Sequence, residues 1–227
     1  MDERSGSILI ALHMTGNKRL LSTSESMAGE ESIMQEQMPN IWFRLMSLEY
    51  RLTSKANSVV RELEEAGVQP GMTVLDFGCG PGRYTLPAAR MVGSKGTIYA
   101  VDVHPLALKA VEKKAKKEGL NNVQLIHSDC ATGLASQSVD VVLLYDALHD
   151  VADKEAVLTE LYRVLKPIGR ISYKDHTLNG EPALSLMHSK GFFPIEQDLR
   201  AFFAHKMMVL GIGRDKLTSA PRRSRGE

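Results

Sequence analysis

Residues Thr73–Thr85 read TVLDFGCGPGRYT, and this stretch says most about the architecture of the chain. Val74, Leu75 and Phe77 form a short apolar run, which is typical of a strand buried on both faces of a parallel sheet. Glycines follow at every second position, and they are Gly78, Gly80 and Gly82. Because they lack a Cβ, they allow a tight turn and a close approach of the backbone to a ligand. Pro81 suits the first turn of a helix, so the stretch predicts a strand, a glycine loop and a helix.

The residues around the glycines indicate which ligand the loop would take. A glycine loop at the carboxyl end of a strand is a ligand site in open α/β sheets. A dinucleotide fingerprint needs its third glycine three residues after the second, where this chain has Arg83. Asp76 lies two residues before the first glycine, and a carboxylate there repels a pyrophosphate and favours a cationic ligand. The loop therefore predicts a site for a positively charged cofactor.

The run Asp76–Gly82 resembles the first motif of the class I S-adenosylmethionine-dependent methyltransferases, in which hydrophobic residues precede Asp-x-Gly-x-Gly-x-Gly. The later motifs are similar to those of ubiquinone- and menaquinone-type small-molecule methyltransferases. The resemblance implies an α/β, Rossmann-like fold with a seven-stranded, mostly parallel sheet of order 3-2-1-4-5-7-6. In that fold the last strand is antiparallel and helices cover both faces. The resemblance also implies S-adenosyl-L-methionine as cofactor and S-adenosyl-L-homocysteine as product.

The expected cofactor contacts lie at the ends of successive strands. Asp102 ends the predicted second strand, and an acid at this distance from a glycine loop accepts hydrogen bonds from ribose hydroxyls. The resemblance implies that Val103 packs on the adenine, that Asp129 binds its amino group and that the backbone of Cys130 meets a ring nitrogen. The other expected cofactor contacts are Asp76, Gly78, Cys79, Gly80, Gly82 and Tyr145.

The exit of the fourth strand is the predicted site of catalysis. The strand, Val139–Asp146, should lie beside the first, because the strand order reverses there. Its exit, Tyr145–Val151, then faces the methyl group and resembles the Leu-His segment of small-molecule methyltransferases. His149 is the predicted general base, because its ordinary pKa lies near working pH, and Asp146 is the second candidate. Alternatively, His149 shapes the pocket without moving a proton. His176, at the mouth of the fifth strand, is expected to reach the substrate.

Composition limits the other functions that the chain could have. Its 227 residues suffice for one α/β domain with an appendage. The net charge of +1 predicts no general attraction to nucleic acid or to an acidic membrane. The lysines of the predicted helix Pro105–Glu118 indicate a solvated face rather than an RNA site. Cys79 and Cys130 make neither a disulfide framework nor a zinc site, so we predict no metal and a cytoplasmic location. No run reaches the length of a transmembrane helix.

The remaining segments have simpler predictions. Residues 1–38 are expected to be a disordered tail, and the functional chain is hypothesised to begin after Met1. The methyltransferase domain is expected over residues 39–212. Its first part, residues 39–67, predicts helices that cap the cofactor, pack plainly on the sheet or lie on a membrane surface. These helices could also pair across a homodimer. The basic residues 213–227 are expected to be a second disordered tail.

Further elements follow from apolar periodicity and from turn residues. Beyond Pro105–Glu118, the expected helices span residues 55–66, 82–91, 153–165 and 182–190. Beyond the first and fourth, the expected strands span residues 97–102, 123–127, 171–175, 192–197 and 201–210. Leu165–Arg170 predicts a turn ahead of the fifth strand, because Pro167 and Gly169 shape a bend.

The acceptor is the least defined part of the prediction. The segment after the fourth strand lacks the Asn-Pro-Pro-Tyr-like sequence typical of enzymes that methylate base amines, and two cysteines do not supply the set that arsenic methyltransferases need. We therefore expect a small-molecule acceptor with an O, C or N atom. Two other classes stay open. One is a catalytically silent partner subunit that binds the cofactor, and the other is an NAD(P)-dependent oxidoreductase, which Asp76 and Arg83 disfavour.

Overall fold

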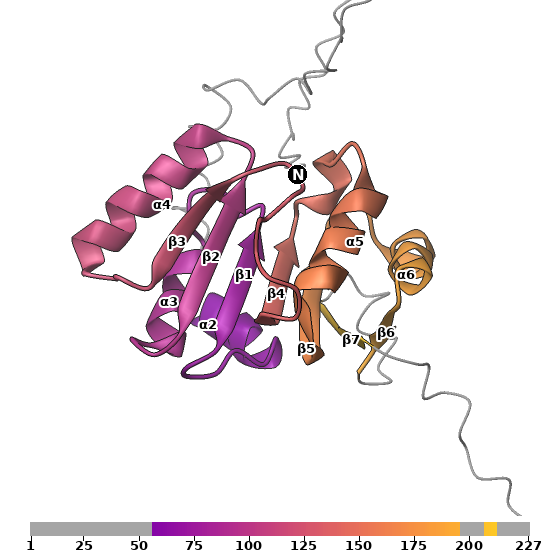
Figure 1. The fold of residues 1–227 in the computed structure, drawn as a ribbon, viewed down its shortest axis with the longest axis horizontal. Helices are drawn as coiled ribbons and strands as arrows, with labels where there is room; N and C mark the ends of the chain where they lie inside the picture. Colours follow the sequence, from indigo (N-terminus) through magenta and orange to yellow (C-terminus); the bar gives the residue numbers. More distant parts are fainter. Residues whose placement is uncertain (1–55, 196–206, 213–227) are drawn as a thin grey trace, which may run out of the picture. The chain divides into compact units, whose positions relative to one another are not determined.

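Seven strands in the described part of the chain form one sheet, and they are β1 (Thr73–Phe77), β2 (Thr97–Asp102), β3 (Val123–His127), β4 (Val139–Tyr145), β5 (Leu165–Lys174), β6 (Phe192–Pro194) and β7 (Met208–Ile212). The computed structural model describes residues 56–195 and 207–212. The sheet has the order β3-β2-β1-β4-β5-β7-β6 (Figure 1). Neighbours from β3 to β5 are parallel, and β7 is antiparallel to β5 and β6. The predicted strand order is confirmed.

Helices cover both faces of the sheet, as predicted. In chain order they are α2 (Ala56–Glu65), α3 (Thr85–Val92), α4 (Pro105–Glu118), the 3-10 helix η1 (Leu148–Asp150), α5 (Lys154–Val164) and α6 (Gly180–Ser189). Side chains of α2, α3 and α4 pack on one face, and those of α5 and α6 pack on the other. Val74 of β1 belongs to the first face, and Leu75 and Phe77 belong to the second. Burial on both faces explains the apolar side chains of β1, because each of them contributes about 1.5–3 kcal/mol.

The helix after the glycine loop begins later than predicted. We expected it to start at Gly82 with Pro81 in its first turn, but α3 starts at Thr85 and Pro81 lies in the turn before it. Gly78, Gly80 and Gly82 have φ values of 76°, 51° and 85°. These left-handed conformations cannot continue into a right-handed helix, so the helix begins only beyond the third glycine.

The predicted turn Leu165–Arg170 lies inside β5 rather than before it. Leu165 pairs with Val139, and the next paired residue, Arg170, faces Val141. The residues between them form a bulge, in which Ile168 is 90% exposed. The bend was predicted correctly, but the strand boundary at Ile171 was wrong, because pairing resumes on both sides of the bulge.

The predicted helix boundaries agree better with the structure than those of the last two strands, since β6 ends at Pro194 rather than at residue 197 and β7 ends at Ile212 rather than at residue 210. Helix α4 has the predicted bounds, and the carboxylate of Asp153 caps α5 by accepting from the backbone N–H of Ala156 at 2.9 Å. Strands β6 and β7 confirm the two antiparallel strands expected at the end of the fold. Residues 196–206 between them lie outside the described residues.

Several predictions fall on parts of the chain that the structure does not describe. They concern the tails 1–38 and 213–227, the first capping helix and its role as a lid. Within residues 56–195 and 207–212, helices are too short or too polar to cross a membrane. The domain limits, the homodimer and the cytoplasmic location stay predictions.

Candidate functional site

The glycine loop and the end of β2 are joined by hydrogen bonds. The backbone N–H groups of Gly78 and Cys79 donate to the carbonyl of Val101, each at 2.9 Å. The N–H of Gly80 donates to Oδ2 of Asp102 at 2.8 Å, and the N–H of His104 donates to Oδ1 of the same carboxylate at 2.8 Å. Burial raises the pKa of Asp102, although the two N–H donors act against this shift. The two predicted parts of the site therefore form one unit.

The glycines of this loop differ in what lies beside them. A Cβ on Gly78 would lie 2.4 Å from Cβ of Ala147, so the segment after β4 packs directly against the loop. A Cβ on Gly80 would meet no heavy atom of the described residues within 4 Å. The backbone at Gly80 is therefore open in the direction in which a Cβ would point. In this loop Gly78 is packed against Ala147, whereas Gly80 has free space beside it and binds the Asp102 carboxylate. This arrangement fits the cofactor that the resemblance implies.

These two glycines support a matched prediction. Gly78→Ala is expected to destabilise the fold by several kcal/mol, because a left-handed φ and a clash with Ala147 act together. Gly80→Ala is expected to cost only about 1 kcal/mol, from its φ alone, but to block the cofactor. Thermal unfolding and calorimetric titration with S-adenosylmethionine measure the two effects. Full cofactor affinity in Gly80→Ala would contradict a ligand position above this residue.

Asp76 lies beneath the loop rather than at its surface. It is 3% exposed, and its Oδ2 accepts from Oγ1 of Thr85 at 2.6 Å. Burial raises the pKa of Asp76 to about 7, the hydrogen bond from Thr85 opposes this rise, and the nearby charge of Asp102 adds to it. Cys79 is also buried, and burial raises the pKa of its thiol, which suits packing rather than nucleophilic chemistry.

The residues predicted to bind the adenine lie in accessible places. Val103 is 39% exposed beside Asp102, so its side chain is accessible to a ring that stacks on it. Asp129 is exposed and Cys130 is half-buried on the connection 128–138, which is described throughout and contains neither helix nor strand.

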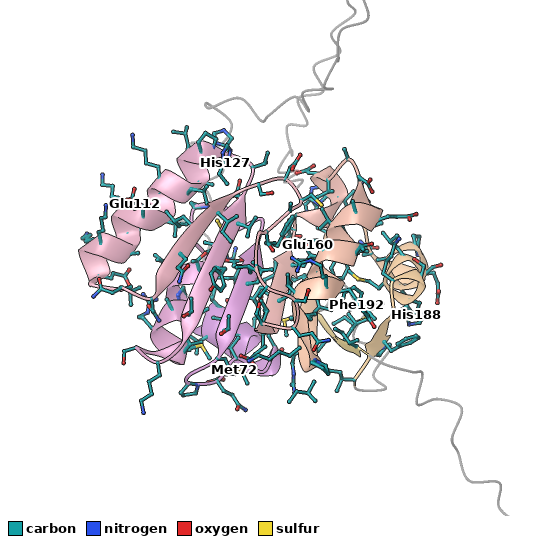
Figure 2. All side chains as sticks on the ribbon, in the orientation of Figure 1. Met72, Glu112, His127, Glu160, His188 and Phe192 are labelled. Atoms are coloured by element: carbon teal, nitrogen blue, oxygen red, sulfur yellow. The ribbon has the colours of Figure 1, made fainter. Side chains whose placement is uncertain are left out.

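Glu160 of α5 holds this connection in place. Its carboxylate accepts from both the backbone N–H and the hydroxyl of Thr132, at 2.9 and 2.5 Å, and Figure 2 labels it between α5 and the connection. Hydrogen bonds from Arg163 are the main cause that lowers the pKa of Glu160 to about 2. The anchor is therefore a carboxylate at neutral pH, and it fixes the loop that carries Asp129.

Tyr145 has a different position from the one expected of a cofactor contact. Its side chain is 6% exposed, and its hydroxyl shares a hydrogen bond of 2.7 Å with Ser172 and one of 2.9 Å with Sδ of Met207. Its ring packs edge-on against Tyr84, with centroids 4.5 Å apart. The Tyr145 side chain therefore belongs to the core, which leaves its backbone as the part that can face a ligand.

The described part of α2 contributes polar groups that the sequence analysis missed. Glu62 accepts from the hydroxyl of Tyr84 and from Nζ of Lys174, both at 2.7 Å, and Lys174 also lies 2.9 Å from the Tyr84 hydroxyl. These bonds tie α2 to the end of β5 beside Tyr145. The ion pair of Glu62 and Lys174 is only partly buried and lies at the carboxyl edge of the sheet. It makes this side of the site polar.

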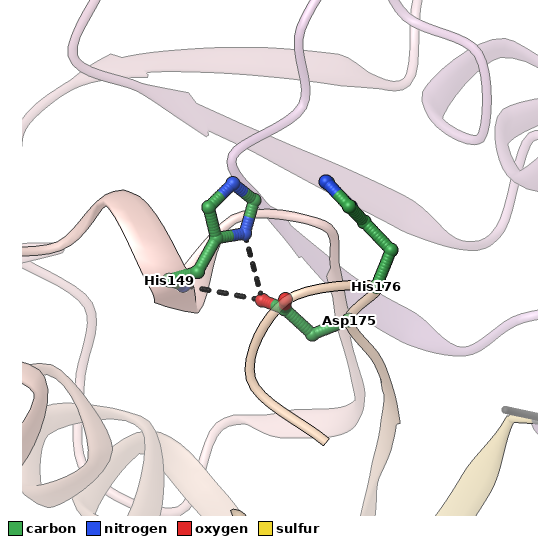
Figure 3. Close-up of side chains that lie close together, drawn as sticks. All are labelled: His149, Asp175 and His176. Atoms are coloured by element: carbon green, nitrogen blue, oxygen red, sulfur yellow. Dashed lines mark hydrogen bonds and ion pairs between the residues drawn. The ribbon is translucent and has the colours of Figure 1, made fainter.

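His149 is held by a carboxylate that the sequence analysis did not single out. Its Nδ1 lies 3.0 Å from Oδ2 of Asp175, which also accepts from the His149 backbone N–H at 3.1 Å (Figure 3). Burial by itself raises the pKa of Asp175, but hydrogen bonds from Leu178, His149 and Thr177 outweigh it and lower that pKa. Asp175 is thus an ionised acceptor, which favours the tautomer of His149 that carries its proton on Nδ1.

Asp146, the second predicted base, is engaged elsewhere. Asp146 has a left-handed φ of 49°. Its Oδ1 accepts a hydrogen bond from the backbone N–H of His176 and also lies 3.0 Å from Nδ1 of the same histidine. The hydrogen bond with Asp146 raises the pKa of His176. The predicted catalytic residues therefore lie in two histidine–carboxylate pairs, whose rings are 4.8 Å apart.

Comparisons with known proteins identify the family of the chain. A family model described as a methyltransferase domain matches residues 68–204. A demethylmenaquinone methyltransferase from Geobacillus stearothermophilus is 37% identical over 108 residues, which are 47% of this chain and 46% of that protein. The UbiE ubiquinone/menaquinone biosynthesis C-methyltransferase of a Shewanella strain is 33% identical over 111 residues, 48% of this chain and 44% of its own. The match spans about half the length of these curated relatives.

Solved structures share the fold. An S-adenosylmethionine-dependent methyltransferase from Aquifex aeolicus superposes with a TM-score of 0.60 at 24% identity, over 78% of this chain and 98% of its own. The [4+2]-cyclase SpnF superposes with a TM-score of 0.55 at 19% identity, over 62% of this chain and 58% of its own. Because the second is named as a cyclase, these likenesses bear on the architecture and not on the reaction.

Proposed function

Because the chain belongs to the class I S-adenosylmethionine-dependent methyltransferases, through a methyltransferase domain at residues 68–204, we propose that it methylates a small molecule. The observation that carries the proposal is the bond of 2.8 Å from the Gly80 N–H to Asp102, beside the open face of Gly80. This bond holds the Asp102 carboxylate beside the backbone of Gly80, which supports a role for Asp102 in binding the ribose. When bound, the cofactor supplies a methyl group on a sulfonium, which is already electrophilic.

The remaining work of the protein is to position the reactants. Orientation of two bound reactants is worth roughly 7–11 kcal/mol of the barrier. We assign the ribose to Asp102, the adenine to Val103, Asp129 and the backbone of Cys130, and the methionine part to the glycine loop. The burial of Asp76 supports an indirect role, in which its charge acts on a cationic ligand through the loop or through water.

We assign to His149 the role of the general base that removes a proton from the acceptor. Its Nδ1–H donates to Asp175, so its Nε2 takes a proton from an acidic O–H or C–H as the methyl group is transferred. The resulting imidazolium lies between Asp175 and Asp150, whose Oδ1 is 3.3 Å from Nε2, and both carboxylates stabilise it. Asp146 is less suited to this task, because its carboxylate already binds His176.

The names of the relatives suggest which class of acceptor the protein methylates. They refer to demethylmenaquinone and to a C-methyltransferase step of ubiquinone and menaquinone biosynthesis. A ring carbon or oxygen with an acidic proton is therefore the acceptor that we propose, since it needs the base that His149 supplies. An amine acceptor would need no base once it is neutral.

A screen with methyl-radiolabelled S-adenosylmethionine tests the function. We expect label to enter a small hydroxylated or quinol-type compound and to stay out of protein and RNA fractions. Tight cofactor binding without label in any small molecule would favour the silent partner subunit instead. A fluorescence titration with NADH or NADPH that shows tight binding would favour the oxidoreductase.

The buried acid gives a prediction on pH and stability. The pKa of Asp76 is about 7 in the folded protein and near its ordinary 3.8 in the unfolded chain. Between these values the folded state binds the extra proton, so Asp76 lowers stability as the pH rises from about 4 to about 7, by on the order of 4 kcal/mol at completion. Asp76→Asn is therefore expected to unfold at a higher temperature than the wild type at pH 8 and to match it near pH 4.

Cofactor binding should have the opposite dependence on pH. An ionised Asp76 favours a cationic ligand, so wild-type affinity is expected to rise through pH 7 with release of a proton. In Asp76→Asn the affinity should be weaker and flat over this range. Calorimetric titrations in two buffers of different ionisation enthalpy measure the released proton. Equal wild-type affinities at pH 6 and pH 8 would remove Asp76 from the binding equilibrium.

A further inference from the structure

Helix α4 packs directly against the glycine loop. A Cβ on Gly82 would lie 3.1 Å from Cγ2 of Val111, so the last glycine of the loop touches this helix. Cys79, in the same loop, belongs to an apolar cluster that includes buried side chains of the helix, and they are Leu108, Val111 and Ala115. The conformation of the loop therefore depends on contacts with α4 as well as on the end of β2.

One lysine of α4 binds the backbone of the loop. Nζ of Lys114 donates to the carbonyl of Pro81 at 2.5 Å, although the two residues are 33 positions apart in the chain. Lys114 is half-buried, because it lies three residues after Val111 and so shares its side of the helix. The sequence analysis assigned the lysines of this helix to a solvated face. That assignment is wrong for Lys114 and correct for the exposed lysines, which are Lys109, Lys113, Lys116 and Lys117.

The bond from Lys114 anchors the loop at a residue that has no N–H of its own. Pro81 lacks this donor, so its backbone can be hydrogen-bonded only through the carbonyl. The residue before it, Gly80, donates its N–H to Asp102 at 2.8 Å. The segment Gly80–Pro81 is therefore held at both ends, by a carboxylate on one side and by an ammonium group on the other. Hydrogen bonds that involve a charged group are roughly twice as strong as those between neutral groups.

We propose that Lys114 is a positioning residue, which holds the glycine loop in its binding conformation before the cofactor arrives. This role rests on the proposed function, in which the loop binds the methionine part of S-adenosylmethionine. All three glycines of the loop have left-handed φ angles. If only a fraction of the molecules have the loop in this conformation, the apparent affinity for the cofactor is reduced by that fraction. Lys114 raises the fraction without touching the cofactor.

The charge of Lys114 separates this role from a purely electrostatic one. S-adenosylmethionine has a net positive charge, so a nearby ammonium group repels it. A lysine that acted only through its field would, when removed, strengthen the binding of S-adenosylmethionine and leave that of the neutral product, S-adenosylhomocysteine, unchanged. A lysine that positions the loop would, when removed, weaken the binding of both compounds.

Calorimetric titration of the full chain with each of the two compounds tests the role. Lys114→Met keeps an unbranched side chain but removes the donor. We expect it to weaken both affinities by about 10-fold, which is the lower end of what a hydrogen bond to a charged group contributes. Lys113→Met removes the same charge at an exposed neighbouring position and should bind like the wild type. Lys114→Arg keeps a charged donor and should recover much of the affinity.

Hydrogen exchange of the ligand-free protein follows the loop itself. The N–H groups of Gly80 and Gly82 are bound within the fold, to Asp102 and to the carbonyl of Cys79. They should exchange faster in Lys114→Met than in Lys113→Met, because the loop opens more often when its anchor is lost. Equal exchange in the two variants would contradict the proposed role.

Two results of the titrations would overturn the role of Lys114 and leave the proposed methyl transfer untouched. One is wild-type affinity for both compounds in Lys114→Met, even if its melting temperature falls, because Lys114 would then serve only stability. The other is tighter binding of S-adenosylmethionine without a change for S-adenosylhomocysteine. A wild-type protein that binds neither compound would overturn the proposed function and this role together.

Discussion

Asp102→Ala is expected to abolish measurable binding of S-adenosylmethionine while the protein stays folded. The carboxylate has two tasks, since it would accept from the ribose hydroxyls and it already holds the N–H of Gly80 at 2.8 Å. Hydrogen bonds to a charged group contribute about 1.5–3 kcal/mol each, so losing the ribose pair weakens binding by at least about 100-fold. Loss of the Gly80 contact loosens the loop and adds to this effect.

Calorimetric titration and thermal unfolding separate binding from folding in this variant. Asp102 lies at the end of β2 outside the three apolar clusters, so we expect only a modest change in melting temperature. Asp102→Asn keeps an acceptor for the loop but loses the charge, and it should bind with intermediate affinity. Glu112→Ala, which removes an exposed acid on α4, is the control for charge and should bind normally (Figure 2). Wild-type affinity in Asp102→Ala would remove this residue from the cofactor site.

The second large effect is expected at the base. His149→Ala should lower kcat by about 100- to 10,000-fold, which is the usual contribution of a general base. Its cofactor affinity should remain that of the wild type, because we assign the ribose to Asp102 and the adenine to other residues. Partial recovery of turnover by added imidazole would identify the missing group as a proton acceptor.

Asp175→Asn tests the same pair from the other side. An amide can present its N–H to Nδ1 of His149 and so select the opposite tautomer, which leaves no lone pair on Nε2. A wrong tautomer of this kind disables a base although the geometry is kept. We expect kcat to fall nearly as far as in His149→Ala, and the double variant to be no slower than either single one.

Controls are needed because Asp175 is 5% exposed and also accepts from the backbone N–H groups of Thr177 and Leu178. Normal unfolding and normal cofactor binding must therefore accompany the loss of rate. Wild-type turnover in His149→Ala would reduce this histidine to a residue that shapes the pocket.

The glycine loop shows how much of the site could be predicted from local sequence. A stretch such as Thr73–Phe77 can only be a buried strand, because its run of apolar residues must be covered on both faces. Spaced glycines must adopt left-handed φ angles for the turn that follows, and all three of them do. The position of Asp102 at the end of the next strand follows from the length of one strand–helix–strand unit. Backbone rules that act over short distances are enough for these conclusions.

Tyr145 and Asp76 show where this local reasoning stops. Tyr145 ends β4 at the expected place, but its ring turns into the core to meet Tyr84 and Ser172. Asp76 lies at the expected place in the loop motif, but Thr85 covers it and burial raises its pKa to about 7. The position of each residue along its strand was predictable, whereas the surroundings of its side chain depended on which other elements pack against it.

The acid–base pairs belong entirely to the folded state. His149 was identified by its residue type and its place after β4, yet nothing nearby in the chain pointed to Asp175, which lies 26 residues away. The partner of Asp146 is His176, 30 residues away. These residues meet because β4 and β5 pair in parallel and end at the same edge of the sheet. Local backbone preferences can be predicted from neighbouring residues in the sequence. Which side chains of two different strands meet depends on the packing of the whole sheet. The histidine–carboxylate pairs at this edge could therefore be identified only from the tertiary structure.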